Sequence, residues 1–148
     1  MNITTAERVK RLQLLRRRLK SFRATKGRRF HMPVWGLHVG TTHPVREQNY
    51  CGTAACALGW AALMPQFRKL GLKMHWSKRD YGWEGLPTLR LDQPNVWGDI
   101  VITGEDAGQI LFGLTDAEST WLFLRMGSRE SVIKRIDKLI AHDGRLNE

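Results

Sequence analysis

The sequence predicts an α+β domain that is mostly α, a compact bundle of about five helices with a small antiparallel β insertion at about residues 72–103. Near both ends of the chain, apolar residues recur at three- and four-residue steps, as in amphipathic helices. Between them lie short runs of alternating character, separated by turns that contain Gly, Pro and Asn. A chain of 148 residues can bury its core as a single domain, so one domain is expected over residues 1–148.

An amphipathic helix is expected over about residues 4–26. Thr4 and Glu7 have the spacing of a capping box, and Gly27 is a typical stop. The apolar stripe of this helix consists of Val9, Leu12, Leu15, Leu19 and Phe22. We expect this stripe to dock on a neutral body formed by residues 30–142.

The next stretch has little periodicity. Residues 28–50 are expected to form a long ordered loop with room for one short extended piece, anchored by Phe30 and Trp35. A helix should follow from about Thr53 to Met64, because Thr53 can cap it, alanines favour it and Pro65 stops it.

The β insertion comes next, with LKMHW, TLRLD and DIVIT as its strand candidates. Three helical segments follow it. EDAGQILFG is a short helix, and the Thr115–Glu118 capping box opens a helix through about Arg125. Ser128 caps a last helix that ends near Gly144. Its apolar face consists of Val132, Ile133, Ile136, Leu139 and Ile140.

The positive charge is concentrated at one end of the chain. The net charge is +10, and residues 1–29 hold eleven Lys or Arg against Glu7 alone, whereas the remaining residues are balanced. Such asymmetry indicates an anionic partner, and the plainer alternative is a solvated charged face. Arg28, Arg29 and Phe30 would also allow stacking on unpaired bases. The predicted anion-binding residues are Arg11, Arg16, Arg17, Arg18, Lys20, Arg23, Arg28 and Arg29.

The order of the motifs resembles a family of small phage and bacterial proteins. The matching segments are RRFHMPVWG, CGTAACALGWAAL, AGQILFGLTDAESTWLF and RIDKLI, within residues 29–140. The family pattern is an FxMxxW segment, a CGTxxCxxGWA motif, an AxxxFGLTxxEAxxLF helix pair and a C-terminal RIxxLI helix. The resemblance implies a phage or phage-derived source and a mostly helical domain, but no catalytic residue. The basic first helix departs from the pattern.

Cys51 raises the alternative of thiol catalysis. It precedes the expected helix, whose N-terminal dipole lowers a thiol pKa, and His75 or His43 would serve as its base. His38 is a further histidine in the sequence, and no spacing singles one out. We favour another interpretation, in which Cys51 and Cys56 are small buried side chains that let a neighbouring element approach closely.

A zinc site is a second chemical alternative. Its ligands would be His38, His43, Cys51 and Cys56, which are residue types that zinc uses. Residues five apart on a regular helix point about 140° apart, so Cys51 would have to lie outside the helix. We expect no metal and no cofactor.

Two further patterns indicate binding modes. AGQILFGLTDAESTWLF has the order of a helix-turn-helix, but Asp116, Glu118, Trp121 and Phe123 are not base-reading residues, so a structural helix pair is expected. The β insertion is rich in aromatic residues, which would either line a groove for a nucleotide or another planar ligand or cover the core. These residues are Trp76, Tyr81, Trp83 and Trp97.

We expect a non-enzymatic, phage-type binding protein whose basic helix binds nucleic acid or an acidic host protein or ribonucleoprotein. Modulation of a host defence complex fits the size, the charge and the source that the resemblance implies. Charges interrupt the N-terminus and no apolar run reaches ~18 residues, so a cytoplasmic location without a membrane span is expected. The alternatives are a Cys51-dependent hydrolase or transferase and a ligand binder built on the aromatic insertion.

Overall fold

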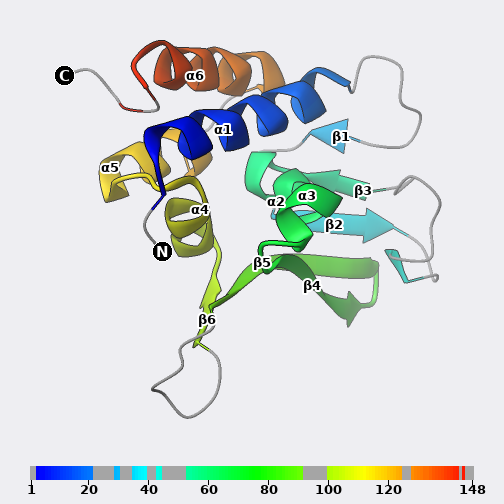
Figure 1. Ribbon diagram of the computed structural model, residues 1–148. Coiled ribbons are helices and arrows are strands. Elements are labelled where there is room, and N and C mark those ends of the chain that lie inside the picture. The colour runs from blue at the N-terminus through cyan, green and yellow to red at the C-terminus, as the bar shows by residue number, and fades with distance from the viewer. Residues whose placement is uncertain are drawn as a thin grey trace.

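The computed structural model describes residues 3–21, 29–30, 35–39, 43–44, 53–91, 100–124, 128–143 and 145. Helix α1 (Thr5–Lys20) and helix α6 (Arg129–Ala141) lie side by side as one layer. A β-sheet forms a second layer, and the short helices α2 (Ala57–Ala62) and α3 (Pro65–Arg68) lie against it, as Figure 1 shows. Within the described residues, no helix has the length and apolar character that a membrane span requires.

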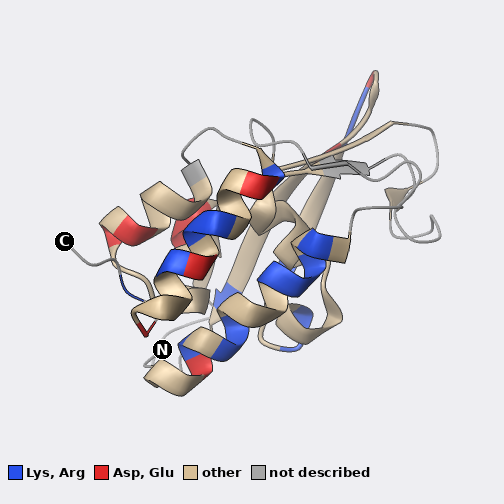
Figure 2. Cartoon of the chain, turned by 90° about the horizontal axis from the view of Figure 1, so that it is seen from above, with Lys and Arg blue, Asp and Glu red and all other residues tan. Residues whose placement is uncertain are grey.

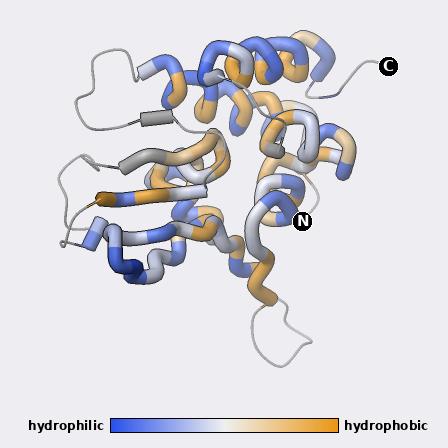
Figure 3. The backbone as a smooth tube through the Cα atoms, turned by 180° about the vertical axis from the view of Figure 1, so that it is seen from behind, coloured by the Kyte–Doolittle hydropathy of each residue, from blue (hydrophilic) through white to orange (hydrophobic). Residues whose placement is uncertain are grey.

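Helix α1 begins where the sequence predicts. The Thr4 side chain accepts a 3.1 Å hydrogen bond from the backbone N–H of Glu7. The described helix ends at Lys20 with Ser21 as its C-cap, and residues 22–28, which include the rest of the predicted helix, lie outside the described residues. Leu12, Leu15 and Leu19 are fully buried, so the predicted docking stripe is confirmed there. Figure 3 shows the resulting alternation of hydrophilic and hydrophobic residues along α1 and α6.

The sheet is larger than the predicted insertion. Across the described ranges it has six strands in the order β1-β3-β2-β5-β4, and β6 pairs with β5. β1 runs parallel to β3, and the other pairs are antiparallel. The strands are β1 (Arg29–Phe30), β2 (Gly36–Val39), β3 (Thr53–Ala55), β4 (Leu72–Arg79), β5 (Gly82–Leu91) and β6 (Ile100–Thr103).

The predicted compact, mostly α bundle was wrong, because the sheet is a full layer of the fold, although an α+β class is consistent with the structure. β4, β5 and β6 form the expected antiparallel insertion, but β1, β2 and β3 extend it into residues predicted as a loop and a helix. Thr53–Ala55 pairs with Leu37 and His38 of β2 instead of starting a helix. Backbone pairing to another strand outweighs the helix preference of the alanines, and a three-residue strand has no period to recognise.

The N-cap of α2 is Cys56, not Thr53. Pro65 does not simply stop a helix: it occupies the first turn of α3, where a missing N–H costs nothing. Gly71 lies in the turn after α3 with φ +100°.

The remaining helices largely follow the prediction. Helix α4 (Glu105–Phe112) ends at Gly113, and Thr115 and Glu118 form both hydrogen bonds of a capping box at α5 (Asp116–Ser119). A π-helical turn, Thr120–Leu124, continues α5. Ser128 caps α6, which ends at Ala141, three residues before Gly144. Val132, Ile136 and Leu139 of α6 are fully buried against the core that includes Leu12 and Leu15 of α1.

Candidate anion-binding face

Two arginines of α1 are buried. Arg8 donates through Nε to the carbonyl oxygen of Gly113 at 3.1 Å and through Nη1 to that of Asp143 at 3.3 Å. Arg11 donates through Nη1 to the carbonyl oxygen of Leu111 at 2.5 Å. The last carbonyls of a helix lack partners within it, so these arginines supply donors to the end of α4.

Burial and the charge of Arg145 lower the pKa of Arg8, while Glu118 opposes the shift. Arg11, which the sequence assigned to the anion-binding set, is only 7% exposed and pairs with Glu7 at 3.0 Å. Arg11 therefore anchors α1 to α4 and is not part of an exposed face.

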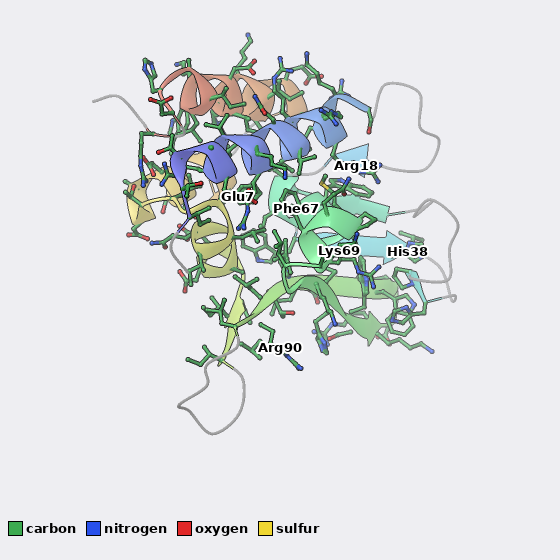
Figure 4. The ribbon with its side chains drawn as sticks, viewed as in Figure 1. Glu7, Arg18, His38, Phe67, Lys69 and Arg90 are labelled. Atoms are coloured by element: carbon green, nitrogen blue, oxygen red, sulfur yellow. The ribbon has the colours of Figure 1, made fainter. Side chains whose placement is uncertain are left out.

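Two more residues of the predicted anion-binding set connect α1 to neighbouring helices. Arg16 forms an ion pair with Asp137 of α6, with its Nη2 3.5 Å from Oδ2. The Arg18 guanidinium lies 5.5 Å from the centroid of the buried Trp60 ring of α2, within cation–π range. Figure 4 labels Arg18 near the end of α1. Both side chains contribute to helix packing as well as to charge.

The exposed cations of α1 are Lys10, Arg17 and Lys20. Residues seven and three apart fall on one side of a helix, so these three form a stripe, with Gln13 between them. On α6, Lys134 and Lys138 are exposed one turn apart. We call Lys10, Arg17, Lys20, Lys134 and Lys138 the basic face. Figure 2, seen from above, shows Lys and Arg distributed along both helices.

The acidic residues of α1 and α6 do not neutralise the basic face. Each of these three carboxylates forms an ion pair with an arginine that is not part of the basic face. The pairs are Glu7 with Arg11, Asp137 with Arg16, and Glu130 with Arg129. The charge of the five exposed cations is consequently left facing solvent.

The structure thus brings together part of the predicted set and adds to it. Arg17 and Lys20 lie on the basic face. Arg23 and Arg28 lie outside the described residues, and Arg29 is described only as part of β1. Sequence reasoning missed Lys134 and Lys138, although their four-residue spacing on the polar side of the last helix was a usable signal.

Cys56 is a poor candidate for thiol chemistry. Its Sγ accepts a 3.5 Å hydrogen bond from the backbone N–H of Gly59, as an N-cap does. Burial raises the pKa of this thiol to about 11, so it is protonated at neutral pH. Cys51, the candidate nucleophile, lies outside the described residues, and His75, one candidate base, is exposed on β4.

The histidines of the candidate zinc set lie near the sheet. His38 is buried on β2, and His43 packs edge-on against Trp83 with ring centroids 4.6 Å apart. In the part of the chain that the structure describes, no three His, Cys, Asp or Glu side chains gather as a metal site would require. Cys51 lies outside that part of the chain.

The aromatic residues of the insertion contribute mainly to packing. Trp76 is buried with Ala55, Trp60 and Leu63 in a second core cluster, and Trp83 packs against it. Tyr81 is exposed at the β4–β5 turn, and Trp97 lies outside the described residues. In the α4–α5 pair, Glu118 and Phe123 are buried. Their burial fits a structural helix pair better than a DNA-reading one.

Comparisons of the chain with protein-family models, with curated proteins and with solved structures found no match. The resemblance to the phage and bacterial family stays a prediction.

Proposed function

We propose that this protein binds nucleic acid non-enzymatically, with the phosphate backbone lying along the basic face. The observation that carries the proposal is the pairing of all three α1 and α6 carboxylates with arginines outside the basic face. Five exposed cations then lie on two adjacent helices whose own carboxylates are all paired elsewhere. Lys or Arg side chains that neutralise phosphates release counterions, which drives sequence-independent binding.

The extent of the basic face favours an extended polyanion over a single charged group. Lys10 and Lys20 are ten residues apart on α1, which corresponds to about 15 Å along a helix axis. Duplex DNA presents one negative charge per ~1.7 Å of its axis, so a stripe of that length faces several phosphates. The same charges would also attract an acidic protein, but the surface of that protein would need carboxylates at positions that match the five cations.

Within this proposal, the predicted phage-type role is modulation of a host nucleic-acid complex. The basic face would compete for the nucleic-acid component of such a complex, which requires no active site. The Cys51 alternative receives no comparable support from the described residues.

Fluorescence anisotropy with a labelled duplex and a labelled single strand tests the proposal. The variant K10Q/R17Q/K20Q removes three exposed charges from α1, and R68Q/K69Q/K73Q removes three exposed charges from α3, its following turn and β4. The first should bind more weakly and reduce the slope of log K against log salt by about 2 to 3. The second should bind nearly as the wild type. Equal losses in both variants, or no binding by the wild type at 50 mM salt, would contradict the proposal.

A further inference from the structure

A cavity lies on the sheet, away from α1 and α6, where the turn after α3 meets β5 and β6. Its volume is about 320 Å³. Four of the residues that line it are cationic, namely Arg68, Lys69, Lys73 and Arg90. The other lining residues are Leu70, Gly71, Thr88 and Val101. Figure 4 labels Lys69, which follows α3, and Arg90, on β5.

The backbone holds these cations in place. Gly71 has φ +100°, and a Cβ built there would lie 2.7 Å from the carbonyl oxygen of Arg90, so the turn passes directly over β5. The Arg90 N–H donates to the Gly71 carbonyl oxygen at 3.2 Å. Lys73 is the register partner of Thr88, whose hydroxyl donates to the Lys73 carbonyl oxygen at 3.3 Å. The cavity wall is thus tied to the sheet.

The charge of the cavity is of one sign. None of the described lining residues is acidic. Cations gathered in a concave surface focus the field and raise the local concentration of anions.

The lining also limits the kind of anion. Its described residues include no aromatic ring on which a base could stack. Arg offers a planar fork of donors and Lys a mobile point charge, and both are used to bind phosphate oxygens. A volume of about 320 Å³ is at the small end for ligand sites.

We propose that this cavity is a binding site for a compact di- or triphosphate group, recognised by its phosphates and not by a base. The site is separate from the basic face and goes beyond the proposed function. Free inorganic polyphosphate and the phosphate chain of a nucleotide share this chemistry, and the experiment compares them.

Isothermal titration of the full chain with inorganic pyrophosphate, inorganic triphosphate and a nucleoside triphosphate tests the site. We expect all three to bind the wild type at 50 mM salt, with triphosphate tighter than pyrophosphate. Similar affinity for inorganic and nucleoside triphosphate would show that the cavity recognises the phosphate groups. A clear preference for the nucleoside form would contradict recognition by phosphates alone.

The two charge-matched triple variants decide where binding occurs. R68Q/K69Q/K73Q should weaken triphosphate binding by roughly tenfold or more, because three charge-assisted contacts are lost. K10Q/R17Q/K20Q should keep it while losing oligonucleotide binding, so the two proposals fail separately. Circular dichroism checks that both variants fold, and amide shifts of residues 69–73 on adding triphosphate provide an independent readout. Equal triphosphate binding by both variants, or no binding by the wild type, would overturn the proposal.

Discussion

Arg11 of α1 joins Leu111 of α4 through a buried 2.5 Å hydrogen bond from Nη1 to the carbonyl oxygen, while its Nε is paired with Glu7. Arg11 lies in the most basic part of the sequence, yet its guanidinium is buried and bound to groups of the protein itself. On this helix, the number of cationic residues in the sequence is therefore larger than the number that a partner can contact.

The variant R11Q should lose stability with little loss of nucleic-acid binding. Glutamine is shorter than arginine and cannot reach the buried Leu111 carbonyl, which loses its donor, while the Glu7 carboxylate is exposed enough to be solvated. Hydrogen bonds to charged groups contribute about 1.5–3 kcal/mol, and we expect a loss of that size in the free energy of unfolding. Urea denaturation measures it. R17Q on the same helix is the matched control and should be within about 0.5 kcal/mol of the wild type, because Arg17 is exposed. Equal stabilities of the two variants would contradict a structural role for Arg11.

The variant D137N should bind nucleic acid more tightly than the wild type. It removes the carboxylate that holds Arg16, and therefore adds a freed guanidinium beside the basic face. The slope of log K against log salt should steepen by about 1 if Arg16 then reaches a phosphate. Stability should change by less than about 1 kcal/mol, because Asp137 is 47% exposed.

The matched control for D137N is E84Q. It also removes one negative charge and one arginine ion pair, that of Arg79, but on the β4–β5 hairpin. Anisotropy titrations of the two variants separate a local effect from one of net charge. If E84Q tightens binding as much as D137N does, the basic face is not the binding surface.

Local features of the fold were predictable from the sequence. The Thr115–Glu118 capping box, the Ser128 cap and the buried leucines of α1 each depend on residues within a few positions of one another. Only one short extended piece was expected where β1 and β2 lie, and β3 was predicted as helix, because strands of two to four residues pair across long sequence separations, as Gly36 does with Gly85. No local pattern encodes such a partner.

The candidate site was predictable only in part, because a charge count does not say where side chains point. Arg8 and Arg11 lie seven and four residues before Leu15, on the buried side of α1. A helical projection would have separated them from Lys10 and Arg17. The cavity beside the turn after α3 could not be recognised, because Lys69 and Arg90 come to line it only through the contacts of that turn and of β4 with β5.

The burial of Cys56 predicts a loss of stability at high pH. Burial on folding raises the pKa of its thiol to about 11, above the ordinary thiol value of about 9. Between these values the unfolded chain loses the proton and the native state keeps it, so the free energy of unfolding falls as pH rises from about 9 to 11. The difference between the two pKa values corresponds to roughly 2–3 kcal/mol in the free energy of unfolding. Urea denaturation at several pH values should show this fall in the wild type and a smaller one in C56A. Parallel pH profiles would contradict the burial of this thiol.

The close contact between α2 and the chain before β2 predicts the sign of a glycine substitution. In an open helix, alanine is more stable than glycine by about 0.8–1 kcal/mol, so G59A would be stabilising if the space were free. A Cβ at Gly59 would instead overlap the carbonyl oxygen of Trp35 and lie 2.9 Å from the Cβ of Ala55. The Trp35 backbone and the Ala55 side chain of β3 cannot both move away to make room for this Cβ. We therefore expect G59A to destabilise the fold by about 1–3 kcal/mol or more. Thermal and urea unfolding decide between the two signs, and a stabilised variant would show that α2 does not pack against Trp35 in this way.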